Sequence, residues 1–240
     1  MGSDGTYIPH AGLDLASPPP STSHIVLDAG TGSGCVFSGP FVNYSVNLGP
    51  LGVPNETPVS PELAYNPRCL KRDLTTSTTK KFCSFQNTTE LILNHDEIFT
   101  FQTTMDGDPR VASNAGTSGV HGGGHFSVAG DPGKEGCCPS LIPLHTHFRS
   151  GADFQVSPGD PYFFLHHGQI DRVYSLWQNL DLSKRPYRQS ALWGTRTFID
   201  SPPSDNGTLD DLLDLGPLGP PLKIRDAMST VSGPFCSRYA

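Results

Sequence analysis

Two pairs of histidines carry the clearest chemical signal in this sequence. His121 and His125 stand four residues apart with only glycine between them, and His166 and His167 are adjacent within an apolar run. Residues four apart share one face of a helix, so the first pair would present both imidazoles on the same side. Imidazoles without a thiolate or carboxylate among them suit copper or zinc. The alternative is two surface histidines in a flexible loop.

The second pair lies on the best-defined element of the chain, a helix expected over 160–180. Asp160 is a good N-cap, and Pro161 suits the first turn. Asp171 follows His167 by four residues and could accept a hydrogen bond from the ring nitrogen that does not face a metal. A buried imidazole needs a polar partner. The alternative for this pair is therefore a core histidine satisfied by Asp171.

The remaining pattern predicts a mainly α fold with long irregular loops and a few short strands. Apolar spacing indicates helices over 91–105 and 121–128 and a short one over 208–215, with strands near 35–37 and 46–48. The three glycines within 121–128 cost about 1 kcal/mol each relative to alanine. We therefore expect that segment to be helical only where packing or a bound metal holds it.

Composition limits the classes of protein to consider. The 240 residues allow one domain, and 16 Lys and Arg against 23 Asp and Glu give a net charge of −7. Without a basic run, nucleic acid is a poor partner. No stretch of 18 apolar residues is present, so we expect no membrane span.

Cysteines and glycosylation motifs favour a secreted glycoprotein with disulfide bonds. None of the six cysteines forms a CxxC pair, which argues against a thiolate zinc site. Four Asn-X-Ser/Thr triplets occur, at Asn43, Asn55, Asn87 and Asn206. The first residues contain no apolar signal-peptide core. We therefore expect the natural N-terminus, with its secretion signal, to lie upstream of Met1.

Two segments resemble a known family. The stretch DPYFFLHHGQIDRVY over 160–174 resembles the second copper-binding signature of the tyrosinase and catechol oxidase family of type-3 copper proteins, and GVHGGGHF over 119–126 resembles the paired ligands of the same copper. Residues 32–41, 67–72, 209–211 and 224–228 are similar to secreted fungal members. The resemblance implies that His121, His125 and His167 bind one copper ion. His166, Asp171 and Phe163 would then surround these ligands.

The resemblance also implies a reaction, the oxidation of o-diphenols to o-quinones by O2, with phenolic small molecules as substrates. That chemistry needs two copper ions, and no histidines here map onto the ligands of the first. We therefore expect residues 1–240 to be one incomplete domain, the second-copper half of a four-helix bundle, which binds one copper and is inactive alone. Residues 1–88 would form a loop-rich linker, 89–182 the copper helices and 183–240 C-terminal loops.

Such a half-bundle would lack an N-terminal partner half and would expose apolar side chains, including Phe163 and Trp177. The alternative function is a non-catalytic mononuclear copper-binding protein. A zinc hydrolase would need a general base next to the first histidine, where Gly122 stands. Hydroxylating members of the family often carry Asn at that position, so Gly122 favours diphenol oxidation.

Residues 134–150 interrupt the family pattern. We interpret them as a translated intron, because Gly133-Lys134 and His147-Phe148-Arg149 are encodable as splice donor and acceptor. The alternatives are a genuine loop insertion, or an auxiliary metal site formed by Cys137, Cys138, His145 and His147. Genomic sequence across these codons decides between them.

Overall fold

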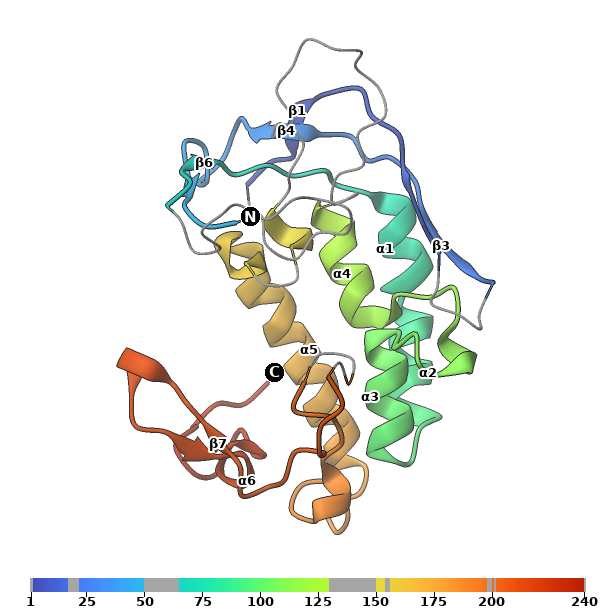
Figure 1. The fold of residues 1–240 in the computed structure, drawn as a ribbon, viewed down its shortest axis with the longest axis vertical. Helices are drawn as coiled ribbons and strands as arrows, with labels where there is room; N and C mark the ends of the chain where they lie inside the picture. The colour runs from blue at the N-terminus through green and yellow to red at the C-terminus, as the bar shows by residue number, and fades with distance from the viewer. Residues whose placement is uncertain are drawn as a thin grey trace.

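The computed structural model describes residues 2–16, 22–49, 65–129, 150–153, 156–197, 200 and 202–239. The predicted insert at 134–150, apart from Ser150, and the Asn55 motif lie outside these residues. A layer of short strands and loops from the N-terminal third lies at one end of a group of helices, and the C-terminal segments lie beside the far half of the longest helix (Figure 1).

Helices dominate the described residues, which confirms the mainly α prediction. The α-helices are α1 (Thr76–Phe82), α2 (Phe85–Leu93), α3 (Ile98–Asp106), α4 (Gly119–Ala129), α5 (Tyr162–Asn179) and α6 (Ile224–Ala227). Short 3-10 turns span Ala112–Asn114, Ser150–Ala152, Ser157–Gly159, Gln189–Ala191 and Gly216–Leu218. Helix α4 packs against α1, α3 and α5, and α2 packs against α3 and α5. None of the described helices is long and apolar enough to cross a membrane.

The strands among the described residues form four small antiparallel pairs rather than one sheet. Strand β1 (Gly5–Tyr7) pairs with β4 (Ser33–Val36), and β2 (Leu13–Ala16) pairs with β3 (His24–Leu27). Strand β5 (Ser45–Val46) pairs with β6 (Arg68–Cys69), and β7 (Leu212–Leu213) pairs with β8 (Leu222–Lys223). Pairs this short gain little on their own. Contacts with the helices and covalent links must therefore hold them.

The main core lies where α2, α3, α4 and α5 meet. Its buried side chains are Leu91, Ile98, Phe101, Met105, Val120, Ile170, Val173 and Trp177. Phe101 and Trp177 stack with their ring centroids 4.5 Å apart. Trp177 is only 1% exposed, so the expectation that it would be bared is wrong. Helices α2 and α3 cover it within this chain.

Glycine allows α4 to pack closely against two neighbouring helices. A Cβ on Gly123 would lie 2.3 Å from Cβ of Phe82 on α1, and a Cβ on Gly124 would lie 2.0 Å from Cε1 of His166 on α5. Both distances are too short for any side chain. Tertiary packing therefore offsets the poor helix propensity of this segment, and the predicted helix over 121–128 is confirmed within α4.

Two other sequence predictions are wrong, one in the extent of a helix and one in its existence. The helix expected over 91–105 is broken between α2 and α3, because the indole Nε1 of Trp177 donates to the carbonyl of His95 at 2.6 Å. That carbonyl would otherwise accept from the amide four residues later. No helix covers 208–215, because Asp211 accepts from the amide and hydroxyl of Thr208 and holds a turn that leads into β7.

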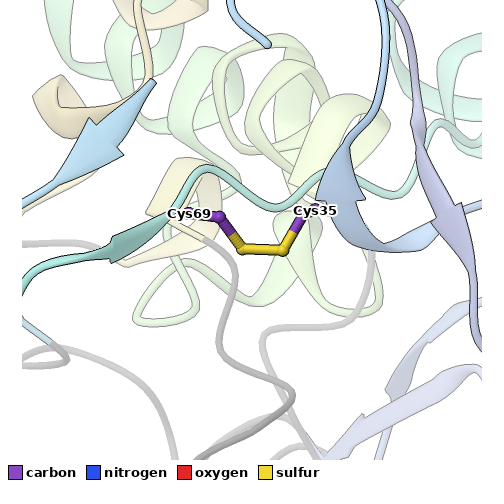
Figure 2. The surroundings of a disulfide bond; sticks show 2 residues. All are labelled: Cys35 and Cys69. Atoms are coloured by element: carbon purple, nitrogen blue, oxygen red, sulfur yellow. A yellow bond between two sulfur atoms is a disulfide. The ribbon is translucent and has the colours of Figure 1, made fainter. Parts of the chain in front are cut away.

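A buried ion pair joins the N-terminal layer to the start of α5, and a disulfide joins two strands within that layer. Arg72 donates to both carboxylate oxygens of Asp160, at 3.0 and 2.7 Å, and both side chains are buried. Asp160 also accepts from the amide of Tyr162 at 2.9 Å, close to the predicted N-cap role. Figure 2 shows the disulfide between Cys35 of β4 and Cys69 of β6. Cys83 and Cys236 are free.

Candidate metal centre

Three imidazoles from two helices converge at one point. Helix α4 presents His121 and His125, and α5 presents His167. Their Nε2 atoms are 3.2 Å apart for His121 and His125, 3.2 Å for His125 and His167, and 3.4 Å for His121 and His167. Three nitrogens about 2.0–2.1 Å from one metal ion would be separated by about 3.3–3.5 Å. The spacing therefore fits a single ion.

Acceptors on the outer side of two rings set the direction of their lone pairs. Nδ1 of His121 lies 3.0 Å from the carboxylate of Asp106, and Nδ1 of His125 lies 2.8 Å from the carbonyl of Gly151. Both partners can only accept, so each Nδ1 carries the proton and each Nε2 exposes a lone pair. Without an ion, these lone pairs would face one another unfavourably. The donor set therefore suits a metal.

Burial keeps the rings of His125 and His167 neutral. Desolvation, followed by the charge of His121, lowers the pKa of His125 to about 4. Desolvation also lowers the pKa of His167, again with a smaller contribution from His121. Metal binding requires unprotonated imidazole. These shifts leave His125 and His167 in the binding form at neutral pH.

His166 lies beside this cluster but faces differently. Its Nε2 donates to the backbone carbonyl of His121 at 2.8 Å, and the ring is only 6% exposed. One of its nitrogens lies within 4.8 Å of ligand atoms of His121 and His125. The bond to the carbonyl and the tighter spacing of His167 favour His167 as the third donor. Burial lowers the pKa of His166 to about 3, so its ring is a neutral packing group.

Phe163 completes the surroundings of His167. The two rings stack with centroids 3.8 Å apart and planes inclined by 25°. Phe163 also lies 6.1 Å from the ring of His125. It is half-buried, so this apolar ring restrains His167 while it borders the cluster. Phe163, which was expected near the ligands, therefore lies against one of the three rings and close to a second.

Asp171 does not make the hydrogen bond predicted for it. Its carboxylate is exposed and accepts from the hydroxyl of Tyr239, and no bond to His167 exists among the described residues. The ring of His167 instead turns toward α4.

Asp106 and Gly151 were not predicted, because both lie outside the histidine motifs and meet them only in the folded chain. The sequence signal for Asp106 is only its place at the end of a predicted helix.

The other described histidines stand apart from this cluster. His10 pairs with the buried carboxylate of Asp73 at 2.9 Å, and His24 pairs with Asp14 at 2.6 Å on the surface. Within the described ranges, the only group of three or more metal-ligating side chains lies around His121 and His125. The auxiliary site suggested for Cys137, Cys138, His145 and His147 falls outside those ranges.

The fold and site define a helical protein whose candidate metal centre is built only from imidazoles on two packed helices. A family model described as the common central domain of tyrosinase matches residues 1–180. The chain belongs to the tyrosinase family, whose members are copper oxidoreductases.

Relatives support the same assignment. The chain is 35% identical over 217 residues to the N-acetyl-6-hydroxytryptophan oxidase of Emericella nidulans, covering 88% of this chain and 53% of that protein. It is 32% identical over 219 residues to tyrosinase P of Aspergillus terreus, covering 90% of this chain and 54% of that protein. The structure also matches a solved polyphenol oxidase variant from Thermothelomyces thermophila with a TM-score of 0.78 and 34% sequence identity. That match covers 100% of this chain and 59% of the solved chain. The chain thus spans about half the length of these relatives.

Proposed function

We propose that this chain binds one copper ion through His121, His125 and His167, as part of an oxidase that converts o-diphenols to o-quinones with O2. The observation that carries the proposal is the convergence of three Nε2 atoms within 3.2–3.4 Å of one another. Family membership favours copper over zinc. When bound, copper would supply one-electron redox chemistry toward a phenolic substrate and O2.

The residues of this chain would prepare the site. Asp106 and the carbonyl of Gly151 hold two rings with their lone pairs inward, and Phe163 restrains the third. His166 links the two helices by its bond to the carbonyl of His121. Gly122 offers no side chain to hold a water molecule that could take the proton of a monophenol. This supports diphenol oxidation over phenol hydroxylation for the intact oxidase.

Quinone formation in this family needs a second copper, and the described residues offer one histidine cluster. We therefore propose that oxidation requires residues additional to those described here, and that the chain alone binds copper without turnover. The isolated cluster equally supports the second candidate, a non-catalytic mononuclear copper-binding protein. The two differ in whether a longer form of the protein oxidises catechol.

Metal analysis of the purified chain tests the copper site. We expect about one copper per chain and an electron paramagnetic resonance signal of one isolated Cu(II) with nitrogen ligands. His167→Ala should abolish tight binding, because three imidazoles are reduced to two. His24→Ala is the matched control, since that exposed ring pairs only with Asp14.

His166→Ala tests whether His166 or His167 is the third copper ligand. We expect this variant to be less stable but still to bind one copper, because its Nε2 is engaged by a carbonyl. Loss of copper in His166→Ala with retention in His167→Ala would refute the assignment. Two coppers per wild-type chain, or quinone formation from catechol by this chain, would refute the claim of a single inactive site.

A further inference from the structure

A cavity lies beside the C-terminal half of α5. This cavity, of about 430 Å³, opens between α5 and the segments 182–187 and 228–239. That volume falls within the range typical of small-molecule sites, about 300–1,000 Å³. None of its lining residues belongs to the histidine cluster.

The walls of this cavity combine apolar and aromatic side chains. Leu176, Leu182, Val231, Tyr187 and Tyr239 line it, and each is at least 37% exposed. Exposed apolar side chains gathered around one hollow are typical of a binding site. An aromatic ring would bury these side chains.

Two arginines give the cavity its charge. Arg172 and Arg238 line it, and neither guanidinium has a hydrogen bond or ion pair with any residue that the structure describes. By contrast, Arg185 and Arg225 are paired with carboxylates. Among the described residues no carboxylate neutralises either guanidinium, although the chain has a net charge of −7. Guanidinium matches the planar carboxylate group, to which it can donate two parallel hydrogen bonds.

The C-terminal wall is held in place without a ligand. The hydroxyl of Tyr239 donates to Asp171, so that carboxylate is already engaged. Gln178 donates from Nε2 to the carbonyl of Met228 at 3.2 Å. The hydroxyl groups of Ser232 and Ser229 close to Tyr187 lower the pKa of its phenol. A preformed cavity binds a ligand at a smaller entropic cost.

We infer that this cavity binds an aromatic carboxylic acid, with the ring against Leu176 and Tyr187 and the carboxylate on Arg172 and Arg238. The inference does not depend on the copper proposal, because it uses none of the proposed ligands. It also assigns no chemistry to the bound acid.

Calorimetric titration of the 240-residue chain with 3-phenylpropionate tests the inference, with neutral 3-phenylpropionamide and acetate as matched probes. We expect saturable one-site binding of 3-phenylpropionate, at least about tenfold tighter than either probe. Arg172→Gln and Arg238→Gln should each weaken it about tenfold or more, as expected for a charge-assisted hydrogen bond. Arg188→Gln is the control, because Arg188 is exposed and does not line the cavity.

Equal affinity for the amide, or no saturation at millimolar 3-phenylpropionate, would overturn the inference. So would acetate binding as tightly as 3-phenylpropionate, since that would mark a simple anion site. Unchanged affinity in both arginine variants would also refute it. Each variant's thermal unfolding is recorded first, so that lost binding can be told from lost folding.

Discussion

Replacing Gly124 by alanine should disrupt the contact on which the histidine cluster depends. The new Cβ would lie 2.0 Å from Cε1 and 2.5 Å from Nδ1 of His166. His166 cannot retreat freely, because its ring is buried and its Nε2 is bonded to the carbonyl of His121. Either the ring leaves its place or α4 and α5 move apart.

The expected magnitude combines three effects. Overpacking costs about 1–3 kcal/mol, and leaving the buried ring nitrogen of His166 unpaired costs about 1–3 kcal/mol. Better helix propensity returns about 1 kcal/mol. We therefore expect Gly124→Ala to lower the free energy of unfolding by about 3 kcal/mol.

Urea unfolding of the metal-free chain measures this change as a lower midpoint at unchanged slope. Gly168→Ala on α5 is the matched control, because its Cβ would meet no atom within 4 Å. It should stabilise the chain by about 1 kcal/mol. If Gly124→Ala were as stable as Gly168→Ala, the close packing of α4 on His166 would be refuted.

Three further predictions follow from other contacts. Arg72→Gln should cost about 3–5 kcal/mol because it strands the buried Asp160 carboxylate. Arg225→Gln, which breaks an exposed pair, should leave the midpoint of the same urea assay almost unchanged; equal losses would contradict the difference in burial. Replacing Cys35 and Cys69 together by serine should lower the free energy of unfolding by about 3–4 kcal/mol, because the disulfide closes a loop with a sequence separation of 34 residues. Cys236→Ser should be neutral. An unshifted urea midpoint in the double variant would refute the claim that the disulfide stabilises the fold. Burial raises the pKa of Cys83, so its thiol stays protonated to higher pH. At pH 8, iodoacetamide should therefore label the exposed Cys236 at least about tenfold faster than Cys83, as measured by peptide mass mapping. Faster labelling of Cys83 would contradict its burial.

Local sequence could predict elements whose neighbours in the chain determine them. Helix α5 could be predicted from its apolar spacing and from the Asp160-Pro161 pair at its start. In the structure it begins at Tyr162. The histidine spacing on α4 likewise predicted the convergence of His121 and His125. That prediction succeeded although glycine opposes a helix there, because the family resemblance supplied what propensity did not.

The remaining features depend on contacts between distant residues. The break between α2 and α3 is made by Trp177, 82 residues after the carbonyl it binds. Four polar residues at 94–97 interrupt the apolar spacing there, but the apolar positions on either side still fit one continuous helix, so the spacing did not reveal the break. Asp106 reaches His121 only because α3 packs on α4. Asp171, which matched the expected spacing, is taken by Tyr239 from the other end of the chain.

The adjacent residues Arg72 and Asp73 join regions that would otherwise be separate. Arg72 reaches forward to Asp160 at the start of α5, while the Asp73 carboxylate accepts from the amides of Gly30 and Gly32. One dipeptide thus links an early loop to the helix that carries His167. The strand layer and the helices should consequently melt as one cooperative unit, and the amides of Gly30 and Gly32 should exchange with deuterium no faster than those in the middle of α5.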